Sequence, residues 1–164
     1  MKVRLIFVGL IASLATFVGI TAAAVAGSDG SANATMCVLN TQLRAENEPN
    51  GASTSAATGH AQVKVLNDGT IEFKTFILNP NDERFNRAHI HLAPAGVNGP
   101  IHVDFLEAGV PVDQLTGRTI TFTGIGRPRG VFAGGTALCA APEMYYVNIH
   151  SNLFPGGAIR GQLG

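Results

Sequence analysis

Apolar and polar residues alternate in short runs along most of the chain, which is the pattern of half-buried β-strands. The clearest case is the range 59–78, where two alternating runs flank a polar turn at residues 67–69. A three-residue turn with glycine in the left-handed conformation would pair Val65 with Ile71, so that apolar meets apolar. A two-residue turn would set Val65 opposite Glu72 instead. The alternation therefore predicts a hairpin with the longer turn.

The same alternation predicts further strands, separated by polar connections rich in Gly, Pro and Asn. These strands cover residues 36–43, 87–92, 101–105, 118–123, 145–150 and 158–163, and the longest connections are 45–58, 79–87, 108–115 and 124–135. No amphipathic helical repeat follows residue 26. The fold class expected from this pattern is all-β, an antiparallel sandwich or barrel.

The N-terminus departs from this pattern. Lys2 and Arg4 precede an uncharged apolar run at residues 5–26, which ends in small residues. This arrangement is typical of a secretory signal with an A-x-A cleavage site, so we expect residues 1–26 to be removed and 27–35 to form a flexible leader. The alternative is an uncleaved membrane anchor, because the run is long enough to span a bilayer. The expected location is secreted, periplasmic or at the cell surface.

Charge and cysteine content narrow the function classes. The chain has 11 Lys plus Arg, two of which are Lys2 and Arg4, so nine remain against 11 Asp plus Glu after the signal. A nearly neutral domain of this kind lacks the basic surface that binds nucleic acid. Two cysteines, Cys37 and Cys139, would meet an oxidising compartment, where a disulfide is the expected state. The alternative is a pair of buried thiols.

Four of the five histidines fall on strand faces that alternate with apolar residues. His89 and His91 share one face of their strand, and His102 and His150 occupy the polar faces of two other strands. Imidazoles without thiolates suit copper or zinc, so these faces are candidates for a metal site. The alternative is that His89 and His91 form hydrogen bonds that anchor the turn after them. The fifth histidine, His60, lies on an exposed hairpin face and is expected to be solvated.

Several segments together resemble the CHRD domain, first described in chordin and widespread in secreted bacterial proteins. They are Ala88-His89-Ile90-His91, Gly99-Pro100, Tyr146-Val147-Asn148-Ile149-His150 and Pro155-Gly156-Gly157-Ala158-Ile159-Arg160-Gly161-Gln162-Leu163. Residues 46–59 fit the opening loop of that family more loosely. The resemblance covers 36–163 and implies one extracellular β-sandwich domain at residues 36–164. It implies no particular reaction.

The histidine spacing is also similar to the copper half of Cu/Zn superoxide dismutase, a Greek-key β-barrel. By that similarity His89, His91 and His150 would be copper ligands, and His102 would be a fourth ligand. Arg160 would guide an anion. Two features depart from the dismutases: the loop between His91 and His102 is shorter, and no separate zinc cluster of histidines with an aspartate is visible.

Two further residues have a structural alternative beside a functional one. Arg160 would form a buried fork bonded to carbonyls or a carboxylate, and this reading is preferred to anion guidance. Asn148 would orient a metal ligand or satisfy loop backbone. The first function expected is an extracellular metal-binding module, with copper preferred to zinc. The second is a non-catalytic domain that binds an extracellular protein or matrix partner, and the third is a dismutase-like enzyme.

Overall fold

The computed structural model describes residues 33–106, 115–130 and 134–164. The predicted signal and most of the predicted leader lie outside these residues. Within them, no helix is long and apolar enough to cross a membrane. The strands are β1 (Thr35–Arg44), β2 (Thr58–Leu66), β3 (Ile71–Leu78), β4 (Phe85–Leu92), β5 (Ile101–Leu106), β6 (Thr119–Ile125), β7 (Arg127–Pro128), β8 (Tyr145–Ser151) and β9 (Ile159–Gln162). The helical segments are α1 (Gly135–Ala140) and the 3₁₀ turns η1 (Ala45–Asn47), η2 (Pro49–Gly51) and η4 (Pro142–Met144).

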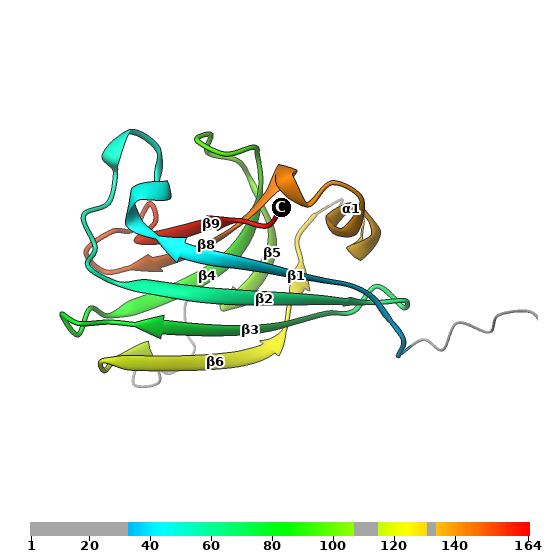
Figure 1. The fold of residues 1–164 in the computed structure, drawn as a ribbon, viewed down its shortest axis with the longest axis horizontal. Helices are drawn as coiled ribbons and strands as arrows, with labels where there is room; N and C mark the ends of the chain where they lie inside the picture. Colours follow the sequence, from blue (N-terminus) through cyan, green and yellow to red (C-terminus); the bar gives the residue numbers. More distant parts are fainter. Residues whose placement is uncertain (1–32, 107–114, 131–133) are drawn as a thin grey trace, which may run out of the picture.

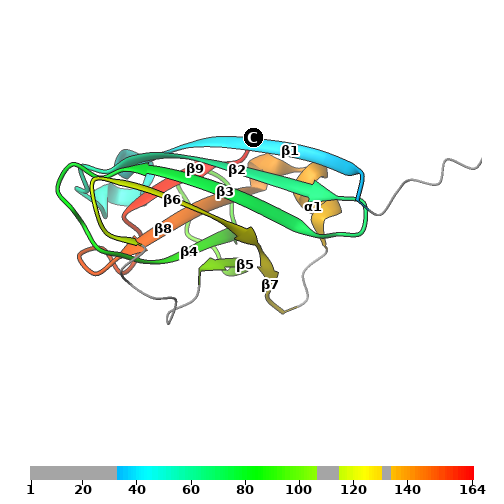
Figure 2. The same cartoon turned by 90° about the horizontal axis from the view of Figure 1, so that it is seen from below.

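The strands form one antiparallel sheet in the order β6-β3-β2-β1-β9-β8-β4-β5-β7. The two ends of this order, β6 and β7, are separated in the chain by Gly126 alone, so the sheet curls back on itself into a nearly closed barrel. Figure 2 shows the barrel as two layers, with β1, β2, β3 and β6 over β4, β5 and β8. The structure thus confirms the predicted all-β architecture.

The hairpin predicted at residues 59–78 forms with the expected register. Val65 pairs with Ile71, and Lys64 pairs with Glu72, where the ammonium donates to the carboxylate over 3.0 Å. Gly69 adopts a φ of +87°, a left-handed conformation that glycine adopts without strain. The alternation of side chains selected this register, because a shift of one residue would move every apolar side chain to the wrong face.

The core lies between the two layers and is mainly apolar. Phe73 of β3 and Phe105 of β5 stack with their ring centroids 4.1 Å apart, which joins the layers directly. The same core includes Val63, Val65, Ile71, Ile90, Val103, Val147 and Ile149, all buried. Thr75 of β3 is an exception: it shares the inward face with Phe73 and is fully buried, and its hydroxyl has no hydrogen-bond partner among the described residues.

Two features near the end of the chain differ from the predictions. Residues 124–135 were expected to form a loop, but Arg127 and Pro128 pair with β5 as the short strand β7. Residues 135–140 form α1, which is too short to show an amphipathic repeat in the sequence. Cys139 of this helix forms a disulfide with Cys37 of β1, as predicted, and this bond ties α1 to the barrel. Figure 1 shows α1 at the same end of the barrel as the start of β1.

Candidate metal centre

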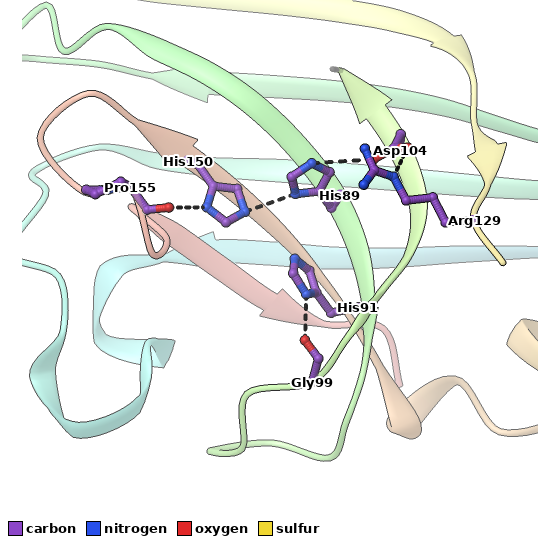
Figure 3. A network of polar contacts seen from close by, with 7 residues as sticks. All are labelled: His89, His91, Gly99, Asp104, Arg129, His150 and Pro155. Atoms are coloured by element: carbon purple, nitrogen blue, oxygen red, sulfur yellow. Dashed lines mark hydrogen bonds and ion pairs between the residues drawn. The ribbon is translucent and has the colours of Figure 1, made fainter. Parts of the chain in front are cut away.

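Three histidines from two adjacent strands converge on one side of the sheet. His89 and His91 alternate along β4, and His150 lies on β8, the neighbour of β4. The ring centroids are 5.5 Å apart for His89 and His91, 4.9 Å for His89 and His150, and 5.9 Å for His91 and His150. One nitrogen from each ring lies within 4.8 Å of the other two. Figure 3 shows the three rings facing a common point.

The cluster is buried, although from the sequence these polar strand faces would be expected to lie on the outside of the sheet. The exposed fractions are 2% for His89, 7% for His91 and 6% for His150. Loops cover this side of the sheet, and two of them contact the cluster through the carbonyls of Gly99 and Pro155. The alternation of residues correctly predicts that the imidazoles point away from the core. It cannot predict that loops fold back over the polar face of the sheet.

Backbone carbonyls fix the orientation of two of the rings. His91 Nδ1 lies 2.9 Å from the Gly99 oxygen, and His150 Nδ1 lies 3.0 Å from the Pro155 oxygen. A carbonyl oxygen only accepts hydrogen bonds, so both Nδ1 atoms must carry the proton. The Nε2 lone pairs of both rings therefore face the centre of the cluster. His91 Nε2 is buried and has no hydrogen-bond partner among the described residues.

A carboxylate orients the third ring. His89 Nε2 lies 3.5 Å from Asp104 Oδ1, and Arg129 donates to the other oxygen of Asp104. With the proton on Nε2, the Nδ1 lone pair of His89 points to His150 Nε2, 3.1 Å away. With the proton on Nδ1 instead, His89 donates a hydrogen bond to His150 Nε2. Asp104 Oδ1 has no hydrogen-bond partner among the described residues, so both tautomers are open to His89. A metal ion that replaces the proton would be held by His89 Nδ1 and by the Nε2 atoms of His91 and His150.

The three rings are uncharged at neutral pH. Burial, followed by repulsion from His150, His91, Arg129 and Arg87, lowers the pKa of His89 to about 3. Burial likewise lowers the pKa of His150 to about 4, and the pKa of His91 is lowered for the same reason. Neutral imidazoles are the form that binds a metal ion. The arrangement thus has the donor set, tautomers and charge state of a three-nitrogen metal site.

The same shifts predict a loss of stability in acid. In the unfolded chain these histidines bind protons below about pH 6.5, whereas in the folded chain His89 and His150 resist protonation down to about pH 4 or below. The free energy of unfolding of the metal-free protein should therefore fall as the pH drops from 6.5 towards 4. Urea unfolding at a series of pH values measures this slope.

Glu48 acts in the opposite direction and must be removed from that measurement. Burial raises its pKa from 4.5 to about 7, so its contribution to stability falls as the pH rises between those values. The experiment is therefore best done with Glu48→Gln. In that background His60→Ala should keep the acid slope, because His60 lies outside the cluster. A flat profile between pH 6.5 and 4 would contradict the prediction.

Asn148 lies between the cluster and a second buried polar group. In the register of the sheet it pairs with His89 on one side and with Arg160 on the other. Its side-chain amide lies near the Glu48 carboxyl and helps to lower the pKa of that group against the effect of burial. Asn148 Oδ1 is buried and has no hydrogen-bond partner among the described residues.

Arg160 is 1% exposed and holds the turn after β4. Its Nη2 donates to the carbonyls of Pro94 and Val97 over 3.2 and 2.9 Å, and its Nη1 lies 3.4 Å from Asn98 Oδ1. These contacts match the structural alternative, a buried fork bonded to carbonyls. The groups that would guide an anion are thus directed at the backbone of a loop.

Tyr146 connects Arg160 to the cluster. The Arg160 guanidinium carbon lies 3.2 Å from the centroid of the Tyr146 ring, which in turn stacks parallel to His91 at 4.9 Å. The Tyr146 hydroxyl accepts a hydrogen bond from the Gly99 amide over 3.1 Å. A β-carbon on Gly99 would overlap the carbonyl of Leu92, so a glycine is required at this close approach. Arg160 and Tyr146 therefore fix the carbonyl that orients His91.

His102 does not join the three histidines. Its ring lies edge-on to Tyr145, with the centroids 6.1 Å apart, and the group of converging ligand atoms has no contribution from it. The pairing of β4 with β5 is irregular between Ala88 and His89 and again between Ile90 and His91. Because of these irregularities, the faces of β4 cannot be matched residue by residue with those of β5. The alternation of side chains therefore does not predict where His102 lies relative to His89 and His91.

Sequence reasoning also missed the groups that orient the rings. Asp104 alternates with the apolar residues of its strand, which is the signal in the sequence for its position near His89. Nothing in the sequence connected Arg129 with Asp104, or the Gly99 and Pro155 carbonyls with the histidines. Backbone carbonyls have no residue signature, so these partners emerge from the folded loops alone.

Comparison with known proteins identifies one similarity. The family model of the CHRD domain matches residues 39–163. No curated protein and no solved structure matches the chain. The match includes every residue of the candidate centre.

Proposed function

This chain belongs to the CHRD domain family, and we propose that it is an extracellular metal-binding module in which His89, His91 and His150 hold one copper ion. The observation that carries the proposal is the convergence of three buried imidazoles, with one nitrogen of each ring within 4.8 Å of the other two. Carbonyls of two loops hold the outer nitrogens of His91 and His150, so that the Nε2 atoms of both rings face this point.

The donor set favours copper. Imidazole nitrogens suit copper and zinc, and copper(II) stands above zinc in the affinity order for such ligands. The outer partners of the rings are a carboxylate and two carbonyls, which are the groups that usually orient metal-binding histidines. A bound ion would accept the three nitrogen lone pairs, while the chain's own residues hold the three rings in position.

Secretion is part of the proposal. The disulfide between Cys37 and Cys139 fits an oxidising compartment, and the apolar run at residues 5–26 fits an export signal. N-terminal sequencing of the protein recovered from outside the cytoplasm tests this step, with Gly27 as the expected first residue. A protein that retains Met1 and stays with the membrane would support an uncleaved anchor instead.

Elemental analysis tests the metal site. After loading with copper and removal of excess metal, the parent protein should retain one equivalent, and His89→Ala with His91→Ala should retain none. His60→Ala and His102→Ala are matched controls and should both keep the equivalent, because neither ring belongs to the converging group. Circular dichroism of each variant would check that the fold persists.

The alternative is a non-catalytic domain that binds an extracellular protein or matrix partner. The hydrogen bonds of His91 to Gly99 and of His150 to Pro155 favour it, because they brace two loops without any metal. Absence of retained metal in the parent protein, or equal retention in the parent and the double variant, would support this alternative and exclude the copper module.

A further inference from the structure

A polar cleft opens beside β9, and none of the three histidines lines it. Its volume is about 510 Å³, and it lies between the loop of η1 and η2, residues 46–50, and the turn after β4 at residues 95 and 96. Arg160 and Gln162 of β9 complete the lining. Figure 1 shows the loop in cyan and the turn in green, both above β9. The volume falls within the range of about 300 to 1,000 Å³ that is usual for ligand sites.

Two amides in the lining have their nitrogen atoms engaged by the backbone. Asn47 Nδ2 donates to the Arg160 carbonyl over 2.8 Å, and Gln162 Nε2 donates to the carbonyls of Ala93 and Glu143 over 2.9 and 2.6 Å. A carbonyl oxygen only accepts hydrogen bonds, so these contacts fix which end of each amide is nitrogen. The amide oxygens, Asn47 Oδ1 and Gln162 Oε1, therefore remain as acceptors for a ligand.

Two carboxyl groups line the same cleft. Glu46 is exposed, whereas Glu48 is 4% exposed and its Oε1 has no hydrogen-bond partner among the described residues. A buried oxygen without a donor loses the hydrogen bonds that water gives it in the unfolded chain, and this loss costs free energy. Glu48 therefore favours a ligand that brings N–H donors and a positive charge.

The cations near these carboxyl groups do not replace such a ligand. Arg160 donates to two carbonyls of the turn after β4, and its guanidinium lies against the ring of Tyr146. Arg44 contacts Glu46 over 3.7 Å, but both side chains are more than half exposed, so water screens the pair. With both carboxyl groups ionised, the described lining has two negative charges, Glu46 and Glu48, against the single positive charge of Arg160.

We propose that this cleft binds a guanidinium group, the side chain of an arginine on an extracellular partner protein. The acceptors come from two segments of the chain, residues 46–50 and β9, so the ligand must donate hydrogen bonds in several directions. A guanidinium has five N–H donors in a fixed plane, and it pairs with a carboxylate through two parallel hydrogen bonds. Asn50 and Gly96 of the lining are exposed, so a side chain from another molecule can enter.

Binding of small arginine compounds tests the proposal. N-acetyl-arginine amide is titrated into the nitrogen-15-labelled protein, and the backbone amide signals of Asn50 and Gly96 are followed. The citrulline analogue has nearly the same shape without the charge, and the arginine compound should bind at least about tenfold more tightly. It should also bind about threefold more tightly than N-acetyl-lysine amide, which has fewer donors. Burial raises the pKa of Glu48 to about 7, so the titration is made at about pH 8, where this carboxyl is mostly ionised.

Substitutions in the protein identify the groups that bind. Glu48→Gln should weaken binding of the arginine compound by about fivefold or more, because it removes the charge and keeps the shape. Glu83→Gln is the matched control and should leave the affinity unchanged, since Glu83 is also buried with an unpartnered Oε1 but does not line the cleft. Ala95→Trp at an exposed position should abolish binding by filling the cleft, and it keeps the test decisive if Glu48→Gln fails to fold.

Three results would overturn the proposal. The first is equal binding of the arginine and citrulline compounds, and the second is an unchanged affinity in Glu48→Gln or Ala95→Trp. The third is tighter binding of free arginine than of the blocked compound, which would identify the amino acid itself as the ligand. Equal binding of the lysine compound would refute the choice of a guanidinium. No metal is present in these titrations, so metal binding by the three histidines is decided separately by the elemental analysis.

Discussion

Replacing Cys37 and Cys139 by serine is expected to lower the free energy of unfolding by about 4 to 5 kcal/mol. The disulfide joins residues 102 positions apart, and closing so long a loop removes much of the freedom of the unfolded chain. It also holds α1, whose Leu138 is fully buried against the barrel, to β1. Urea unfolding of the oxidised parent protein and of the double variant measures the difference.

Reduction of the parent protein provides the matched control. The reduced parent should unfold at nearly the same urea concentration as the double serine variant, because both lack the same cross-link. Metal retention at low urea should persist in both, since the disulfide does not touch the three histidines. A decrease below about 1 kcal/mol would show that the rest of the fold already fixes α1 against β1.

Arg160→Met is expected to have the second large effect. The substitution leaves the carbonyls of Pro94 and Val97 without the donor that now satisfies them, in a region where Arg160 is 1% exposed. Unpaired buried acceptors and the loss of the contact with Tyr146 should lower the free energy of unfolding by about 3 kcal/mol or more. Urea unfolding measures this effect.

The same variant should weaken the metal site. Arg160 fixes the turn that carries the Gly99 carbonyl, and this carbonyl holds the proton of His91 on Nδ1. Loss of such an outer partner typically costs about 10- to 100-fold in metal affinity. Nitrogen-15 chemical shifts of His91 in the metal-free protein should show a single Nδ1–H tautomer in the parent and a mixture in the variant.

Arg44→Met is the matched control for Arg160→Met. Arg44 is the cross-strand neighbour of Arg160 on β1, but its side chain is 52% exposed and contacts Glu46 at the surface over 3.7 Å. Its removal should change stability by less than about 1 kcal/mol and leave His91 unaltered. If the two substitutions gave equal effects, Arg160 would have no special role in positioning the turn.

Most of the strands, and the pairing within one hairpin, could be predicted from the sequence. The alternation in 59–78 selected the three-residue turn, and the pairing of Val65 with Ile71 follows from it. The predicted disulfide between Cys37 and Cys139 is also confirmed. Both predictions rest on properties that do not depend on the tertiary structure. These are the two faces of a strand and the pairing of thiols in an oxidising compartment.

The candidate centre was predictable in part. The face shared by His89 and His91 follows from strand geometry, and His150 lies on the corresponding face of β8. That β8 is the neighbour of β4 depends on the strand order, which local alternation does not specify. Strand geometry did not predict that His102 lies outside the group, because the pairing between β4 and β5 is irregular.

By itself, the sequence determined which side chains face the core and which face away, since side-chain direction in a strand is a local property. The tertiary structure alone decided that the polar face would be buried, that three imidazoles would meet there, and which nitrogen of each ring would point inward. The physical reason is that ring orientation depends on acceptors brought from distant loops, the carbonyls of Gly99 and Pro155 and the carboxylate of Asp104. Their positions exist once the chain has closed around the cluster, and no local pattern of residues encodes them.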